Sequence, residues 1–387
     1  MKNIYICFLR EESEIIGILN KIRQQCIAIN NLGYSTGLII SRNDSVVLYE
    51  VNNGDLIEIN QMKYTQTGCF DENRSKYFKG LSSLIRLNQF LNFAKQMINE
   101  HQPESVYIRN IQPITSSVAF FIRSISKKNM KVYWEIPTYS KSHEKAKNIK
   151  DLFYNLMHRY ISRFLTNNVA IAAEEGLQKK GFIFTTNGVN VRSVFLKKNI
   201  PHEGINLICV ATFDHWHGYD RLIEGLRNYY DTEHVNKKQI VQIHMVGNGN
   251  VQPLIDQVNK YNLNKYIKFH GVLRGVELDE VFDSMDIAVG NLGFHRIGVF
   301  ADTSIKIREY CARGIPFITA LNDSDFPSDY AYLKKVPADE SAIDILSIIM
   351  FYEKLKNNHL DYSKEMRRYA ENHLTWEQKM RFIVESV

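Results

Sequence analysis

The sequence is poor in cysteine: it has five among 387 residues, an odd number with no C-x-x-C pair. Disulfide frameworks and zinc sites need paired or clustered cysteines, so neither is expected, and a reducing cytosol fits best. Apolar runs are also short, because the N-terminal run stops at Arg10 and the stretch 342–352 is interrupted by Asp344. A bilayer span needs about 18 apolar residues and a signal peptide a longer apolar core. We therefore expect a soluble or peripheral protein.

Short repeats and low-complexity tracts are absent too, while 44% of the residues are apolar and 23% are charged. That composition is typical of an ordinary globular protein, and the length fits two domains of about 150 to 200 residues.

The formal net charge of +6 is unevenly distributed, with two basic groups close together: Arg123, Lys127, Lys128 and Lys131, then Lys141, Lys145, Lys147 and Lys150. A solvated face explains them. The alternatives are attraction to an anionic membrane or to a pyrophosphate-linked lipid acceptor and, less favoured, to nucleic acid.

Strand-like runs alternate with amphipathic helices along the chain, which predicts α/β layers with parallel sheets. In the first half we expect strands at 2–8, 35–40, 105–109, 132–136 and 169–172, and helices at 18–32, 81–101, 114–126 and 149–165. A turn-rich, basic stretch at 187–201 suits a crossover between domains. The alternation then restarts, with strands at 205–212, 241–246, 267–269, 287–289 and 317–320.

The fold prediction is therefore two Rossmann-like domains, over 1–195 and 202–365. Two final helices are expected at 362–373 and 376–387.

The stretch 300–320 combines a loop suited to phosphate, a helix and a buried strand. Ser304 is a plausible helix N-cap, Gly314 closes the helix, and Pro316 prevents its continuation. In a parallel sheet such a loop lies at the carboxyl ends of the strands, where ligands bind, and the first helical turn attracts anions. Lys306 and Glu309 are three residues apart, so both can face one ligand.

This segment resembles the donor-binding signature of the family-4 glycosyltransferases, which have the two-domain GT-B fold with a central cleft. Glu309 takes the place of the signature's second glutamate, ahead of Gly314-Ile-Pro316, and Ala301 takes the place of the first. A variant of the pattern, S-x-K-x-x-E-Y, occurs in polysaccharide-synthesis members, and this chain matches it from Ser304 to Tyr310.

The resemblance implies an acceptor-binding first domain and a donor-binding second domain. In the resembled fold the last helices return to pack on the first domain, so the two final helices are candidates to do so, and residues from about 370 to 387 are expected to complete that domain. The resemblance also implies that Glu309 holds the nucleotide ribose, that the start of the helix meets the donor diphosphate, and that Lys306 grips the departing group. The residues expected at that helix start are Thr303, Ser304 and Ile305.

After its first strand the second domain reads TFDHWHGYDR, in which Gly218 allows a sharp turn into a helix. The family has an arginine and a lysine here that clasp the diphosphate, whereas this chain has Thr212 and His217. We therefore expect Arg296 or Lys306 to compensate. A structural, hydrogen-bonding role remains the alternative for His217.

Three other loops of the second domain are candidate nucleotide contacts. Gly247 and Gly249 form a G-x-G that lacks the third glycine of a dinucleotide fingerprint, so we interpret it as a turn near the nucleotide or as a turn alone. Val272 and Arg274 lie in the loop that holds the nucleobase in the resembled fold.

The loop from Gly290 to Gly298 presents His295 and Arg296. Arg296 is either a bidentate phosphate ligand or a surface arginine without a partner. Asp323-Ser-Asp325 matches a metal-binding D-x-D, but its surroundings favour a turn, and no metal is expected.

The first domain offers fewer candidates. Gly17 precedes a helix and is expected to let an acceptor approach the backbone. Arg109, Glu135 and Tyr139 stand at predicted strand ends, where Arg109 meets an anionic acceptor and Glu135 orients a hydroxyl. A structural ion pair or exposed strand ends are the alternatives.

The functional prediction is a retaining glycosyltransferase that extends a cell-surface polysaccharide, such as a capsule, on a lipid-linked acceptor at the cytoplasmic membrane face. The donor is expected to be a UDP-sugar, or else a GDP-sugar, with no cofactor and no nucleic acid partner. No histidine stands as a clear general base, so the leaving diphosphate is expected to take the proton. Charge stabilisation then falls to Lys306 and, second, to Arg296. The retaining outcome and the lipid acceptor come from the resemblance alone.

Two other classes of protein remain open: a non-catalytic nucleotide- or sugar-binding protein of the same fold, and an NAD-dependent oxidoreductase. The second of these lacks an intact glycine fingerprint.

Overall fold

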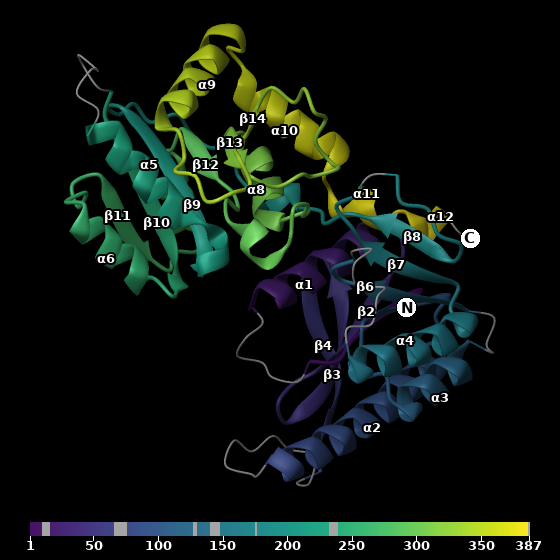
Figure 1. Ribbon diagram of the computed structural model, residues 1–387. Helices are drawn as coiled ribbons and strands as arrows, with labels where there is room; N and C mark the ends of the chain where they lie inside the picture. Colours follow the sequence, from purple (N-terminus) through teal and green to yellow (C-terminus); the bar gives the residue numbers. More distant parts are fainter. Residues whose placement is uncertain are drawn as a thin grey trace. The chain divides into compact units, whose positions relative to one another are not determined.

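The computed structural model describes residues 1–9, 16–65, 76–126, 130–139, 148–174, 176–231 and 239–385. The chain forms two compact units (Figure 1). Unit 1 comprises Met1–Ala172, Gly176–Thr186 and Trp376–Val387, and unit 2 comprises Ala173–Glu175 and Asn187–Thr375.

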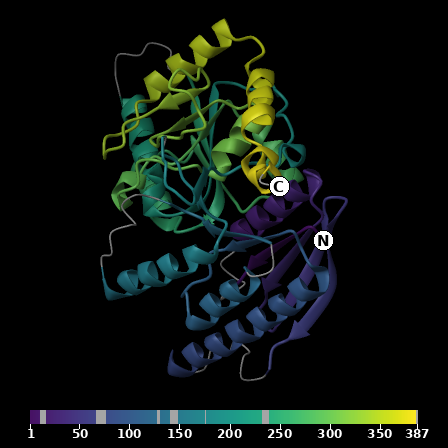
Figure 2. The same ribbon diagram turned by 90° about the vertical axis from the view of Figure 1, so that its right-hand side faces the viewer.

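Unit 1 is built on an eight-stranded sheet in the order β4-β3-β2-β1-β5-β6-β7-β8. Its strands are β1 (Asn3–Cys7), β2 (Thr36–Ser41), β3 (Ser45–Asn52), β4 (Asp55–Lys63), β5 (Ser105–Arg109), β6 (Lys131–Ile136), β7 (Asn167–Ile171) and β8 (Phe182–Thr185). Its helices before the crossover are α1 (Ile16–Asn31), α2 (Lys76–His101), α3 (Ser116–Ile125) and α4 (Ile149–Ile161). Helices α2 and α3 lie side by side in both views (Figures 1 and 2).

The hairpin of β3 and β4 is absent from the sequence prediction. Both strands pair antiparallel, and the two residues between them, Asn53 and Gly54, have φ of 50° and 85°. Two left-handed residues in a two-residue loop are typical of a hairpin turn, and Asn-Gly is the usual sequence for it. The signal was therefore present in the chain, between two alternating apolar runs.

The C-terminal helices α11 (Trp376–Met380) and α12 (Phe382–Glu385) return to unit 1, as predicted. The buried Trp376 donates from Nε1 to Oε1 of Gln24 on α1 at 2.9 Å. The ring of Phe382 lies 5.7 Å from that of Tyr133 on β6. Helix α10 (Tyr362–His373) stays in unit 2 instead, because Met366 and Ala370 are buried in that unit's core.

Unit 2 has a six-stranded, all-parallel sheet in the order β11-β10-β9-β12-β13-β14. Its strands are β9 (Ile205–Phe213), β10 (Val241–Gly249), β11 (Ile267–Gly271), β12 (Ile287–Val289), β13 (Phe317–Thr319) and β14 (Leu333–Lys335). Its other helices are α5 (Tyr219–Asp231), α6 (Gln252–Lys260), α7 (Val276–Phe282), α8 (Ile305–Arg313) and α9 (Ile345–Asn358). Chain order reverses between β9 and β12, and ligands of doubly wound sheets bind at such a switch point.

The segment before β9 belongs to unit 2 from Asn187 onward, whereas the sequence prediction ended the first domain at 195. The physical reason is burial, since Val189, Val191 and Val194 lie in the core of unit 2.

The G-x-G at 247–249 forms the end of β10, which corrects the predicted turn. Gly247 pairs with Ala211 and Gly249 with Phe213, in parallel register with β9. Both glycines have positive φ, and a Cβ on Gly247 would lie 1.8 Å from the carbonyl oxygen of Ala211. Glycine is required here because the two backbones approach too closely for a side chain.

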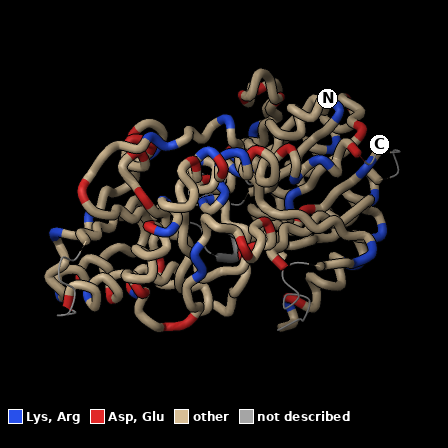
Figure 3. Tube along the Cα trace, turned by 90° about the horizontal axis from the view of Figure 1, so that it is seen from above, with Lys and Arg blue, Asp and Glu red and all other residues tan. Residues whose placement is uncertain are grey.

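Basic and acidic residues are interspersed along the trace of both units (Figure 3). Of the two basic groups, Lys127, Lys128, Lys141, Lys145 and Lys147 lie outside the described residues. Arg123 and Lys150 are exposed, but the Nζ of Lys131 is buried, so the group is not one continuous solvated face.

The four cysteines that the structure describes are buried and free of disulfides, while Cys69 lies outside the described ranges. No described helix combines the length and the apolar character that a bilayer crossing requires.

Candidate functional site

Two loops meet at the switch point of unit 2. One contains the short helix η4 (His215–His217) after β9, and the other contains η5 (Phe294–Ile297) after β12. The amide of Leu292 donates to the carbonyl oxygen of His217 at 2.9 Å. A Cβ on Gly218, whose φ is +70°, would lie 2.5 Å from the amide nitrogen of Gly293. The left-handed conformation and the close approach together require glycine at 218.

The helix α8 begins next to this junction. Ser304 occupies the N-cap position but makes no side-chain cap hydrogen bond, so its hydroxyl does not close the helix end as predicted. Instead, the segment before β9 fixes the loop that precedes α8: Nδ2 of Asn187 donates to the carbonyl oxygen of the buried Thr303 at 2.7 Å. The amides of the first turn of α8 keep the positive end of the helix dipole.

Arg308 anchors the same loop from inside the unit. Its side chain is fully buried and donates to the carboxylates of Asp323 and Asp325 and to the carbonyl oxygens of Ser304 and Asn187. Both carboxylates of the D-x-D motif are therefore engaged by a guanidinium. The described residues contain no group of three or more metal-ligating side chains. Sequence reasoning missed Arg308, because nothing in its spacing distinguishes it from a surface arginine on α8.

The ammonium group of Lys306 lies beside Tyr219, which directly follows the junction glycine Gly218, and has no carboxylate partner among the described residues. Its Nζ donates to the hydroxyl of Tyr219 at 3.2 Å, and no described acid lies within ion-pair distance. Burial lowers the pKa of Lys306 to about 8, against the opposing influence of Cys209 and Asp302. The side chain is half-buried, so the ammonium is still mostly protonated at neutral pH and keeps capacity for an anion.

His217 lies beside the same tyrosine, with the two rings stacked at 5.7 Å. Its Nδ1 accepts a hydrogen bond from the amide of Asp214 at 3.2 Å, which completes a capping box for η4. Burial and the nearby Lys306 lower the pKa of His217 to about 4. The ring is therefore neutral, and because Nδ1 accepts, the proton resides on Nε2. One ring nitrogen is structural, and the other remains a hydrogen-bond donor.

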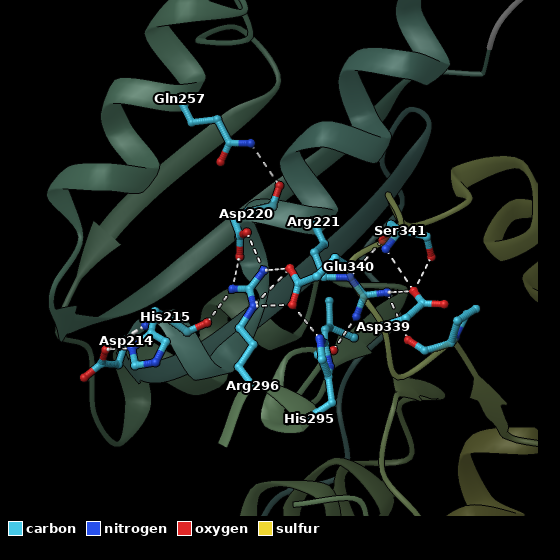
Figure 4. A network of polar contacts seen from close by, with 12 residues as sticks. Asp214, His215, Asp220, Arg221, Gln257, His295, Arg296, Asp339, Glu340 and Ser341 are labelled. Carbon is cyan, nitrogen blue, oxygen red and sulfur yellow. Dashed lines mark hydrogen bonds and ion pairs between the residues drawn. The ribbon is translucent and has the colours of Figure 1, made fainter. Parts of the chain in front are cut away.

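Arg296 is held in a carboxylate network (Figure 4). Its guanidinium donates to Asp220 at 2.7 and 2.9 Å, to Glu340 at 2.6 Å, and to the carbonyl oxygen of His215 at 2.6 Å. His295 lies 2.6 Å from the same Glu340, and the two partners lower the pKa of Glu340 to about 2. The description of Arg296 as a surface arginine without a partner is wrong. Because two carboxylates already neutralise its charge, Arg296 is a weaker candidate for a phosphate ligand than the sequence indicated.

Arg221 is a second residue that sequence reasoning missed. It is buried and donates to the carbonyl oxygens of Leu292, Pro337 and Ser341 and to Asp339 (Figure 4). The available signal was its place directly after Gly218-Tyr-Asp, at the start of α5. Its contacts fix the loop after β12 against the loop after β14.

Glu309 lies on α8 one turn after Lys306, and the two side chains form no ion pair with each other. The carboxylate is half-buried and makes no hydrogen bond or salt bridge to a described residue. Burial raises its pKa, and the nearby Arg313 opposes that shift. A half-buried carboxylate without a partner has unused acceptor capacity. Its predicted role at the ribose stays a prediction.

Ala301, at the position of the missing first glutamate, lines a cavity of about 540 Å³ in unit 2. The polar side chains of Asn322, Ser328 and Lys335 also line this cavity.

In the predicted nucleobase loop, Val272 and Arg274 are exposed beyond the end of β11. Ile305 is the first residue of α8.

In unit 1 the structure brings Glu135 and Arg109 together. Glu135 is fully buried, and its carboxylate accepts from Arg109 at 2.5 Å, Tyr107 at 2.8 Å and Gln25 at 2.9 Å, with Lys21 at 3.7 Å. Burial raises the pKa of Glu135, but Lys21 and Arg109 outweigh it, so the net shift is downward. Of the alternatives that the sequence leaves open, the structure shows the ion pair between Arg109 and Glu135. Contact of Glu135 with an acceptor stays a prediction.

Gly17 and Tyr139 are the other two acceptor candidates. Gly17 is exposed on α1 with open space around it. The ring of Tyr139 packs against Phe182 and Phe184 on β8, at 6.0 and 5.3 Å.

Comparisons with known proteins show the fold. No family model and no curated protein sequence matches the chain. Among solved structures, a sucrose-phosphate synthase from Thermosynechococcus elongatus is similar, with a TM-score of 0.63 and 13% identity over 100% of this chain and 98% of that one. The lipopolysaccharide outer core galactosyltransferase WaaB has a TM-score of 0.57 and 12% identity, covering 100% of this chain and 99% of its own. WaaG, a glycosyltransferase involved in lipopolysaccharide biosynthesis, has a TM-score of 0.57 and 11% identity, with full coverage of both chains. Their organisation is that of GT-B glycosyltransferases, so the predicted fold of two Rossmann-like domains is confirmed.

Proposed function

We propose that the protein is a nucleotide-sugar-dependent glycosyltransferase whose donor diphosphate binds at the start of α8. The observation that carries this proposal is the half-buried ammonium of Lys306, which has no carboxylate partner among the described residues and lies 3.2 Å from the hydroxyl of Tyr219, at the switch point of a doubly wound sheet. An anion there also meets the helix dipole. The similar folds of known glycosyltransferases support the same activity.

The residues around Lys306 suit a departing diphosphate. As the acceptor oxygen bonds to the anomeric carbon, the bond from that carbon to the diphosphate oxygen breaks, and its electron pair moves to the diphosphate. We assign the stabilisation of that charge to Lys306 and to the Nε2–H of His217, and the diphosphate takes the acceptor's hydroxyl proton. In this scheme the neutral Nε2–H donor of His217 replaces one of the two cations that the resembled family uses at the diphosphate.

The remaining assignments extend the same proposal. Glu309 holds the ribose hydroxyls, the exposed Val272 and Arg274 meet a uracil or guanine, and the cavity beside Ala301 takes the transferred sugar. We infer retention of configuration, a hexose as the transferred sugar and a lipid-linked acceptor in polysaccharide synthesis, at the cytoplasmic face of a membrane with anionic lipid. Retention, the hexose and the lipid-linked acceptor follow from the resemblance to polysaccharide-synthesis members of family 4, and the anionic lipid follows from the two basic groups between residues 123 and 150.

A thermal-shift measurement tests the binding half of the proposal. We expect UDP or GDP, at a hundredfold excess over its dissociation constant, to stabilise the protein by about 2.7 kcal/mol. The matching nucleoside monophosphate should stabilise less, because it lacks one phosphate for Lys306. A protein that no nucleoside diphosphate stabilises would contradict a donor site at α8. Stabilisation without transfer or hydrolysis of any nucleotide sugar would favour a non-catalytic binding protein.

The pH dependence offers an independent check. The pKa of Lys306 in the free enzyme is lowered to about 8, and the protonated form is the one that stabilises the diphosphate. We therefore expect kcat/KM to fall as the pH rises through about 8. A Lys306→Arg variant keeps its charge at high pH and should lose that descending limb, whatever its absolute rate. An unchanged limb in Lys306→Arg would assign it to another group.

A further inference from the structure

The outer face of α4 in unit 1 carries a stripe of apolar side chains in solvent. Ile149, Leu152, Phe153 and Leu156 are 84%, 52%, 56% and 58% exposed. Their spacing places them on one side of a helix. Such a stripe normally faces a protein core, yet the core of unit 1 is met by the other side of α4, through Ile161, Tyr154 and Met157. The helix therefore has a second apolar face that the described residues leave exposed.

Basic residues border this stripe. Lys150 and Arg159 on α4 and Arg163 just after it are exposed, and Asp151 is the one acidic residue of the helix. The neighbouring helix α3 extends the pattern, because Arg123 lies 5.9 Å over the ring of Phe164. Phe120, one turn before Arg123 on the same side of α3, is 66% exposed. The surface therefore combines large apolar groups at its centre with cations around them.

We propose that this surface, the outer face of α4 with Phe120 and Arg123 of α3, docks on an anionic phospholipid bilayer. An amphipathic helix that lies in the membrane interface places its apolar side chains at the acyl boundary and its lysines and arginines at the lipid phosphates. Charge favours this occupant, because the exposed charged residues that border the stripe are cations and α4 contains a single acid, Asp151. An excess of positive charge around an apolar stripe matches a negative lipid surface. The inference deepens the membrane contact of the proposed function.

Vesicle co-sedimentation tests the surface, with full-length protein and no nucleotide present. We expect binding to phosphatidylcholine vesicles that contain phosphatidylglycerol, and at least tenfold weaker binding to phosphatidylcholine alone. Phe153→Glu with Leu156→Glu should reduce binding to the mixed vesicles at least tenfold. The matched control is Leu360→Glu in unit 2, where Leu360 is 92% exposed, and it should bind as the wild type does.

Arg159→Gln with Arg163→Gln should weaken binding to anionic vesicles and flatten its dependence on salt, while an unchanged salt dependence would overturn the role given to these cations. The substituted side chains are exposed, so circular dichroism and the melting temperature should match the wild type. Wild-type protein that stays in solution at every phosphatidylglycerol fraction would overturn the proposal without any variant.

Unaltered vesicle binding by the double glutamate variant would also overturn the proposal. So would a wild-type dimer that the same substitutions dissociate, in the absence of vesicle binding, since the face would then be an interface between two copies. Nucleotide stabilisation is measured without vesicles, so a failure of the membrane surface is distinguishable from a failure of the donor site.

Discussion

Lys306→Ala should lower kcat by about 10²- to 10³-fold, the range seen when one preorganised donor to a developing oxyanion is removed. The physical reason is that the Lys306 ammonium has no carboxylate partner among the described residues, so its charge remains for the diphosphate. In a half-buried position that charge acts in a lower effective dielectric than a surface lysine's. The measurement is single-turnover transfer from the nucleotide sugar that stabilises the protein most.

The same variant should leave stability nearly unchanged. Lys306 makes one hydrogen bond, to Tyr219, and its removal relieves the cost of a partly desolvated cation. Lys260→Ala is the matched control, because Lys260 is an exposed lysine on α6 of the same unit. Near-normal turnover in Lys306→Ala would remove the central residue of the proposed mechanism, and an equal loss in Lys260→Ala would indicate a nonspecific effect of charge.

The sequence predicted unit 2 better than unit 1, for physical reasons. The helix from Ile305 ends where Gly314 and Pro316 dictate, and local chemistry of this kind can be read from neighbouring residues. The C-terminal return to unit 1 was recognisable only from the resemblance, because the contact of Trp376 with Gln24 joins residues far apart in the chain.

Two of the misses share one cause, which is pairing between distant segments. Arg296 was assigned to a phosphate or to open solvent because Glu340, its partner, lies in a loop after another strand. Gly247 and Gly249 were expected to form a turn because the close approach of β9 is invisible in the sequence of β10. The hairpin of β3 and β4 differs, since Asn53-Gly54 was a local signal that the sequence reading passed over.

Arg308→Met should destabilise unit 2 by about 3 to 5 kcal/mol, because it leaves Asp323 and Asp325 buried without their cation. For a unit of this size that corresponds to a fall in melting temperature of roughly 6 to 20 °C. The measurement is thermal unfolding followed by circular dichroism, and a shift of less than about 2 °C would contradict a buried ion-pair network.

A compensating variant separates lost charge from lost volume. Adding Asp323→Asn and Asp325→Asn to Arg308→Met removes the uncompensated carboxylates and should recover most of the stability. Nucleotide binding should not recover with it, because Arg308 also holds the carbonyl oxygens of Asn187 and Ser304 that shape the loop before α8. Full recovery of both would mean that the donor loop keeps its conformation without Arg308. If stability recovers and nucleotide binding does not, then Arg308 has two roles: it neutralises the buried carboxylates of unit 2, and it shapes the loop before α8 that is proposed to bind the diphosphate.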